Sequence, residues 1–241
     1  MYPVSKKGSA YDRVSTMFSP DGRLYQVEYA GKIVEQGTIG VGMIFADGVL
    51  FGADKKVSSK LVLPESIEKL FKIDEHIGAI SAGLVGDARR IVQLARKDAQ
   101  ENRMYYEEKI HVETLVKNIC SVKQLFTQYA GMRPFGISFV IGGVDDSGSR
   151  LFETEPSGAL AEYKAIAIGR GRKEANKFLE KNYKDAMLLD DAIRLVVGAL
   201  EKSLDEKEKI DINRLDFAFI SKNNAFEKVG KQKLKTVLGK K

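Results

Sequence analysis

The chain has 241 residues, of which 44% are hydrophobic and 30% charged, the composition of an ordinary globular protein. This length suits one layered domain over residues 1–241, and the hydrophobic content excludes an intrinsically disordered chain. The formal net charge is +6, and five positive charges fall in a basic C-terminal tail at residues 231–241: Lys231, Lys233, Lys235, Lys240 and Lys241. We therefore expect no nucleic-acid partner, because the excess charge is confined to this tail.

Apolar stretches are too short for a membrane protein. The longest, residues 39–46 and 135–144, contain glycines and have about half the length that a membrane-spanning helix needs. No apolar signal segment follows the first residues, so we expect a cytoplasmic protein with no membrane partner. The single cysteine, Cys120, repeats in a helical pattern with Val116 and Ile119, which predicts a buried thiol and excludes a disulfide within the chain.

The first half of the chain predicts strands followed by two helices. Residues 1–12 show no periodicity and are expected to be a mobile tail. The start signal Ser19-Pro20-Asp21 predicts a helix within residues 20–36, with its apolar face from about Leu24 to Glu35. Alternating apolar and turn residues predict one hairpin over 38–46 and 49–54, and another over 70–73 and 77–82. Apolar residues spaced three and four apart then predict helices over 88–99 and 112–130.

The second half repeats this order. Strands are predicted at 135–144 and 150–154, around the turn residues 145–148, and a further strand at 160–168. Helical periodicity returns at 175–179 and 189–204, before strands at 216–221 and 225–228 and a terminal helix. Strands, two helices, strands, two helices and strands predict an α+β fold, a four-layer α-β-β-α sandwich of two mostly antiparallel sheets.

A search for chemistry among the polar residues gives no metal site and no cofactor. His76 and His111 have no partners at ligand spacing. The turn Gly169-Arg170-Gly171 lacks the third glycine and the Lys-Ser/Thr pair of a phosphate-binding loop. Asp145-Asp146 and Asp190-Asp191 lie at a turn and at a helix start, where capping accounts for them.

The N-terminal region carries the most specific motif. Tyr11-Asp12-Arg13 and the run FSPDGRLYQVEYA at residues 18–30 resemble the signature of proteasome α-type subunits of the 20S core particle, as in archaea. Further matching segments lie at 66–69, 83–89, 133–136, 151–158, 162–165 and 167–169. The resemblance implies an N-terminal-nucleophile hydrolase-like sandwich with an extra N-terminal helix.

The resemblance also implies a function without catalysis by this chain. Relatives form a seven-membered outer ring of α subunits, stack on rings of proteasome β subunits, and pass unfolded polypeptide substrates. Their tails close the axial pore, and ATPase-type or other activators dock through C-terminal tails. The positions that match the family's gate cluster are Tyr11, Asp12, Pro20 and Tyr29.

Two further groups of positions follow from the same resemblance. The pocket for the activator tail corresponds to Lys69, Gly83, Leu84, Gly22 and Glu28, and the pore constriction to Tyr129, Ala130, Gly131 and Met132. The chain departs from the family at Gly31, where many relatives have arginine, and at Ala130, where glycine is common.

One alternative is a self-processed threonine hydrolase. Gly37-Thr38 resembles the cleavage site of catalytic relatives, Asp54 follows sixteen residues later, and Lys69 comes after it. Cleavage there would remove the helix and the whole signature, and an uncleaved Thr38 has an amide nitrogen that cannot act as a base. A nucleotide- or nucleic-acid-binding module is the third class, which ATP or DNA binding that survives removal of the basic tail would favour.

Overall fold

The computed structural model describes residues 14–56, 61–63, 66–204 and 210–239. Two antiparallel sheets of five strands each lie in this part of the chain. One has the order β10-β9-β2-β1-β8 and the other β3-β4-β5-β6-β7. The first comprises β10 Glu227–Lys228, β9 Leu215–Ser221, β2 Gly48–Asp54, β1 Gly40–Phe45 and β8 Ala165–Ile168. The second comprises β3 Leu70–Asp74, β4 Ile77–Gly83, β5 Ile137–Asp145, β6 Gly148–Thr154 and β7 Leu160–Glu162.

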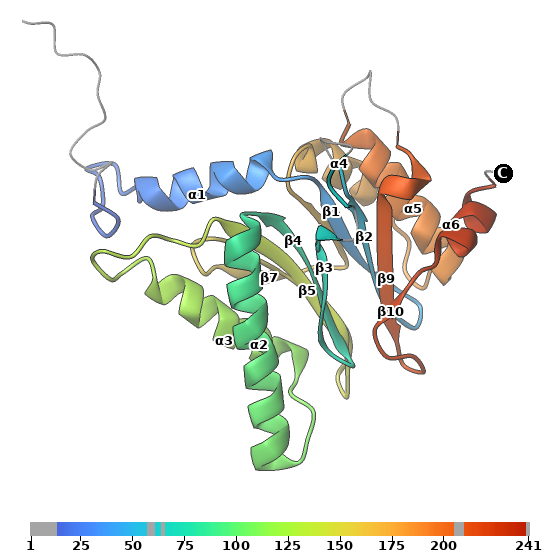
Figure 1. Ribbon diagram of the computed structural model, residues 1–241, viewed down its shortest axis with the longest axis horizontal. Helices are drawn as coiled ribbons and strands as arrows, with labels where there is room; N and C mark the ends of the chain where they lie inside the picture. Colours follow the sequence, from blue (N-terminus) through green and yellow to red (C-terminus); the bar gives the residue numbers. More distant parts are fainter. Residues whose placement is uncertain (1–13, 57–60, 64–65, 205–209, 240–241) are drawn as a thin grey trace, which may run out of the picture.

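Helices cover the outer faces of the two sheets (Figure 1). The helices α2 (Val85–Tyr106) and α3 (Val112–Leu125) pack on the second sheet. The helices α4 (Arg172–Asn182), α5 (Leu189–Lys202) and α6 (Lys231–Leu238) lie on the side of the first, with a short 3-10 helix, η3, at Ile212–Arg214. A third apolar cluster fills the space between the sheets. These layers confirm the predicted four-layer sandwich, because three separate cores need four layers.

The helix α1 (Tyr25–Gln36) lies across one end of the sandwich and contacts β4 and β5 (Figure 1). It buries Ala30 and Val34. Gly37 ends the helix at a tight contact, since a Cβ at this position would lie 2.6 Å from the backbone nitrogen of Gly83. Only glycine fits here without a shift of backbone, so α1 is held directly against the end of β4.

Three predicted elements have different limits in the structure. The predicted strand 160–168 is two strands, β7 and β8. The chain passes from one sheet to the other at Tyr163 and Lys164, so that β7 pairs with β6 and β8 pairs with β1. The helix predicted over 112–130 ends at Leu125, where backbone turns take over. The N-terminal helix begins at Tyr25 rather than at residue 20, because the segment 19–23 forms a turn in which the Ser19 hydroxyl accepts a hydrogen bond from the Arg23 N–H (3.1 Å).

The basic C-terminal segment begins with a helix. Its first lysine, Lys231, donates hydrogen bonds to the carbonyls of Ile212 (3.1 Å) and Asn213 (3.2 Å), and Leu234 and Val237 are buried. This part of the segment therefore packs on the body of the protein. Among the residues described, no helix is both long and apolar enough to cross a membrane.

Candidate functional site

The side chain of Lys69 lies beside Thr38, where α1 passes into β1. Its Nζ donates hydrogen bonds to the carbonyl of Thr38 (2.6 Å), to the carbonyl of Ile39 (3.0 Å) and to the Thr38 hydroxyl. Lys69 is buried, and burial lowers its pKa to about 7, with the nearby Asp54 opposing the shift and Lys55 adding to it. The amine therefore points into the protein, toward oxygen acceptors.

Asp54 is near this lysine but is occupied by another partner. Arg214 binds both oxygens of its carboxylate through two guanidinium nitrogens, with 3.0 Å from Nε to Oδ1. Lys55 forms an ion pair with Asp216 (2.7 Å). The three residues that a threonine hydrolase would need, Thr38, Asp54 and Lys69, thus lie close together, but the carboxylate is already neutralised.

The Gly37–Thr38 peptide bond lies inside a continuous, packed segment. The Gly37 carbonyl accepts a hydrogen bond from the Arg170 N–H (2.8 Å), and the turn 169–171 lies between β8 and α4. Because this bond joins α1 to β1, the nitrogen of Thr38 is an amide without a basic lone pair. The groups for hydroxyl activation by a terminal amine are therefore incomplete in the intact chain.

The residues predicted for activator docking divide between the two ends of α1. Lys69, Gly83 and the half-exposed Leu84 lie at its C-terminal end, next to Gly37. Gly22 and Glu28 lie toward its N-terminal end, and Glu28 is roughly 12 Å from the last residue of the helix, Gln36, at 1.5 Å per residue. Arg23 donates to the Glu28 carboxylate (2.7 Å from Nε) and keeps the pKa of Glu28 low. One chain therefore carries these residues as two separate groups.

Of the predicted gate residues, Tyr11 and Asp12 lie outside the described residues. Pro20 is exposed in the turn that precedes α1. Tyr29 is 39% exposed and stacks on Tyr25, with ring centroids 6.4 Å apart. The stacked pair forms an aromatic surface on α1.

The predicted pore residues 129–132 form an exposed turn after α3, with Gly131 at φ +82°. This turn shares a groove of about 370 Å³ with the segment Val14–Thr16 and with Gln26 of α1. Beyond the turn, Arg133 forms a bidentate ion pair with Asp87 (2.7 Å for both contacts). The Asp87 carboxylate also accepts a hydrogen bond from the Gly136 N–H (2.8 Å). Although burial opposes the shift, these bonds lower the pKa of Asp87. The turn therefore lies beside the first described residues and has a charged anchor.

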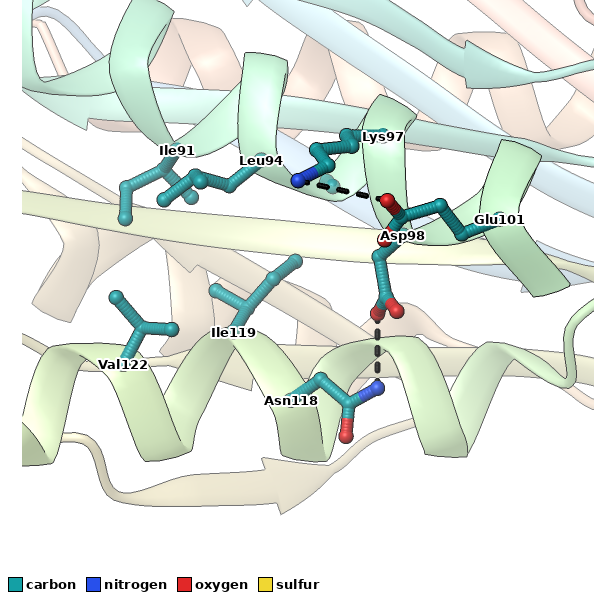
Figure 2. Close-up of a pocket in the computed structure, with 9 residues that line it drawn as sticks. Ile91, Leu94, Lys97, Asp98, Glu101, Asn118, Ile119 and Val122 are labelled. Carbon is teal, nitrogen blue, oxygen red and sulfur yellow. Dashed lines mark hydrogen bonds and ion pairs between the residues drawn. The ribbon is translucent and has the colours of Figure 1, made fainter.

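Figure 2 shows a separate apolar groove of about 270 Å³ between α2 and α3, with Ile91, Leu94, Ile119 and Val122 along it. Its polar end has two contacts, from Asn118 to Asp98 (2.8 Å) and from Lys97 to Glu101 (3.4 Å). None of the predicted site residues lines it. It offers an apolar contact surface rather than a reaction centre.

The polar residues set aside in the sequence have structural contacts. Asp145 accepts a hydrogen bond from the Ser147 N–H (2.9 Å), which confirms its predicted role in the turn, and a second one from the Val112 N–H at the start of α3 (2.9 Å). His76 is buried, with its Nε2 2.8 Å from the Ile110 carbonyl. In the described ranges, no group of three or more His, Cys, Asp or Glu side chains could hold a metal ion.

Sequence reasoning missed one buried charged residue, Lys123 of α3. Its Nζ donates to the Thr154 hydroxyl (3.1 Å) and carbonyl (3.3 Å), and burial lowers its pKa to about 7. The signal was present, since Lys123 falls on the same helical stripe as Val116 and Ile119. A lysine on an apolar stripe predicts a buried amine with specific acceptors.

The stacked antiparallel sheets, the outer helices and the Thr38–Lys69 pair at the start of β1 define an N-terminal-nucleophile hydrolase-like protein. Residues 34–220 match the family described as "Proteasome subunit", and residues 11–32 match the N-terminal signature of the α-type members of that family. The chain therefore belongs to the proteasome α-subunit family.

Curated relatives agree over nearly the whole length. The chain is 51% identical to the proteasome alpha subunit of Methanopyrus kandleri over 231 residues, which cover 96% of this chain and 93% of the relative. It is 51% identical to that of Methanothermobacter thermautotrophicus over 221 residues (90% and 88%). It is 49% identical to that of Methanoregula boonei over 240 residues (99% and 98%).

Proposed function

We propose that this chain is a non-catalytic, gate-bearing α subunit of a proteasome core. It forms a seven-membered outer ring with other α subunits and stacks on β subunits, which carry the proteolytic sites. Unfolded polypeptides pass through the ring in the cytoplasm. The observation that supports this most strongly is α1, which continues through Gly37 into β1 and covers the end of the sandwich.

Gating is supported by the position of the pore turn. The first described residues, Val14–Thr16, share a groove with Ala130, Gly131 and Met132 of this turn. In the proposed ring, the exposed turns of all subunits form the constriction. Tyr11, Asp12, Pro20 and Tyr29 hold the open form of the gate, with the Tyr25–Tyr29 stack as its fixed surface.

Activator docking uses the two groups of residues at the ends of α1. Lys69, Gly83 and Leu84 of one copy face Gly22 and Glu28 of its neighbour in the ring. A C-terminal carboxylate suits Lys69, because a charge-assisted hydrogen bond is roughly twice as strong as a neutral one. The backbone at Gly83 and the exposed Leu84 provide the remainder of the pocket.

The self-processed threonine hydrolase is not favoured. Its nucleophile, Thr38, is present beside a lysine, but the terminal amine that would serve as base is tied up in the Gly37–Thr38 bond. The relatives named above are proteasome alpha subunits, and they match at least 90% of this chain.

The gating role can be tested by deleting residues 1–12 from the chain and assembling it with a β-type partner. We expect hydrolysis of long, unstructured peptides by the particle to rise several-fold, because the obstruction at the pore is gone. Hydrolysis of tripeptide substrates should change less and serves as the control. Equal rates for long peptides with and without the tail would contradict the gating role.

A further inference from the structure

The inward position of Lys69 conflicts with a simple docking pocket. Its amine donates to two oxygens of Thr38 and to the Ile39 carbonyl, all inside the chain. A carboxylate arriving from outside would need the same amine. The lysine must therefore exchange one set of acceptors for another.

The acceptors of the Lys69 amine lie near an exposed side chain. Gly37 precedes Thr38 and packs against the backbone of Gly83. Leu84, which follows Gly83, is 39% exposed. The Thr38 acceptors of the amine and the exposed Leu84 thus each lie one residue from the contact between Gly37 and Gly83.

No ion pair holds the lysine in place among the described residues. Asp54 is the nearby acid on β2, but Arg214 already binds both oxygens of that carboxylate. Lys55 is paired with Asp216. Burial lowers the pKa of Lys69 to about 7, which weakens any attraction that depends on its charge. The hydrogen bonds to Thr38 and Ile39 are what retain it.

We propose that Thr38 is a positioning residue whose hydroxyl and carbonyl hold Lys69 in an inward state that cannot bind an activator. Docking of a C-terminal carboxylate draws the lysine outward. The inference rests on the proposed role of Lys69 in docking. Because only the outward fraction can bind, the inward state lowers the apparent affinity for the activator tail.

The test uses the full chain assembled into its ring, with Thr38 replaced by valine or serine. Valine has nearly the same shape but no hydroxyl, whereas serine keeps the acceptor. The probe is a synthetic peptide from the C-terminus of an ATPase-type activator with a free carboxylate, and its amidated form is the blank. We expect Thr38→Val to bind the free-acid peptide about tenfold more tightly, and Thr38→Ser to bind it as the unmodified chain does.

A second readout needs no activator. The rate at which acetic anhydride acylates Lys69 at neutral pH, followed by mass spectrometry, reports how often the amine reaches solvent. We expect it to rise about tenfold in Thr38→Val, the same factor as the gain in affinity. Thr154→Val is the matched control, because its hydroxyl binds the other buried lysine, Lys123, and its loss should leave the acylation of Lys69 unchanged.

The outcomes separate the two proposals. If Lys69→Met binds the free-acid peptide as well as the unmodified chain does, the docking role is wrong, and acylation alone then decides whether Thr38 retains the lysine. If Lys69→Met abolishes binding but Thr38→Val changes neither affinity nor acylation, docking stands and the holding role of Thr38 is overturned.

Discussion

Two lysines of this protein share almost the same local chemistry in different places. Lys69 and Lys123 are both buried, both bind the hydroxyl and the carbonyl of one threonine, and both have a pKa lowered to about 7. Lys123 is fully enclosed between α3 and β6, with the ring of Phe139 5.9 Å from its amine. The Lys69 amine instead lies at the junction of α1 and β1, where Gly37 contacts Gly83 and the following residue, Leu84, is half-exposed.

This comparison shows that a lysine–threonine pair is not by itself a functional site. At Lys123 the pair satisfies a buried amine within a core, where nothing outside can reach it. At Lys69 the same contacts lie between a helix end, a glycine contact and the half-exposed Leu84. The surroundings, and not the pair, distinguish Lys69 as the lysine that can exchange its acceptors.

The largest effect on stability should come from adding a Cβ at the glycines that pack against backbone near each lysine. A Cβ at Gly37 would lie 2.6 Å from the Gly83 nitrogen, and one at Gly158 would lie 2.7 Å from the Cys120 carbonyl of α3. We expect Gly37→Ala and Gly158→Ala each to lower the free energy of unfolding by roughly 2–4 kcal/mol, because backbone must shift. Urea denaturation measures this loss.

Hydrogen exchange of the same two variants tests the difference between the surroundings of Lys69 and those of Lys123. Gly37→Ala should raise the rate of amide hydrogen exchange in α1 and change the acylation rate of Lys69. Gly158→Ala should raise the exchange rate in α3 alone. Gly31→Ala is the control, since a Cβ there meets nothing within 4 Å and α1 gains helix propensity. A Gly37→Ala protein with unchanged stability and exchange would show that α1 is not held through this contact.

For each lysine, a smaller effect on stability is expected from pH. Both folded-state lysines have a pKa of about 7, below the value of roughly 10.4 in the unfolded chain, so between these values the unfolded chain binds more protons. Stability should therefore rise with pH above 7, by about 1 kcal/mol per pH unit for each lysine, and the rise should vanish below pH 7.

Urea denaturation between pH 7 and pH 8.5, roughly the lower half of the interval between the two pKa values, checks this expectation. Lys69→Met and Lys123→Met should each reduce the slope by a similar amount, and the double variant should nearly remove it. If Lys123→Met alone removed the whole slope, the two amines would not be equivalent, and Lys69 would already be exposed to solvent in the folded protein.

Much of the fold could be predicted because the hydrophobic pattern has clear periods. The helical stripes of α2, α3 and α5 and the hairpins β1–β2 and β3–β4 follow from it directly. The break at Tyr163 and Lys164 could not be predicted, because residues 160–168 look like one strand and only tertiary pairing divides them between sheets. The apolar pattern from about Leu24 agrees with the start of α1 at Tyr25, but the start signal at Ser19 placed the helix too early, because the Ser19 hydroxyl caps a turn instead of a helix.

The candidate site was predictable in part of its geometry. Lys69, Gly83 and Leu84 do gather at one end of α1, and residues 129–132 form an exposed turn. The inward direction of the Lys69 amine depends on contacts with Thr38 and Ile39, about thirty residues away in sequence, which no local pattern encodes.

The continuity of α1 with β1 is tested most directly by the intact mass of the chain recovered from an assembled particle. If the chain keeps α1 as permanent structure, the mass includes the residues on both sides of the Gly37–Thr38 bond. Recovery of a polypeptide that begins at Thr38 would contradict the account, because the freed amine beside Lys69 would complete a threonine nucleophile.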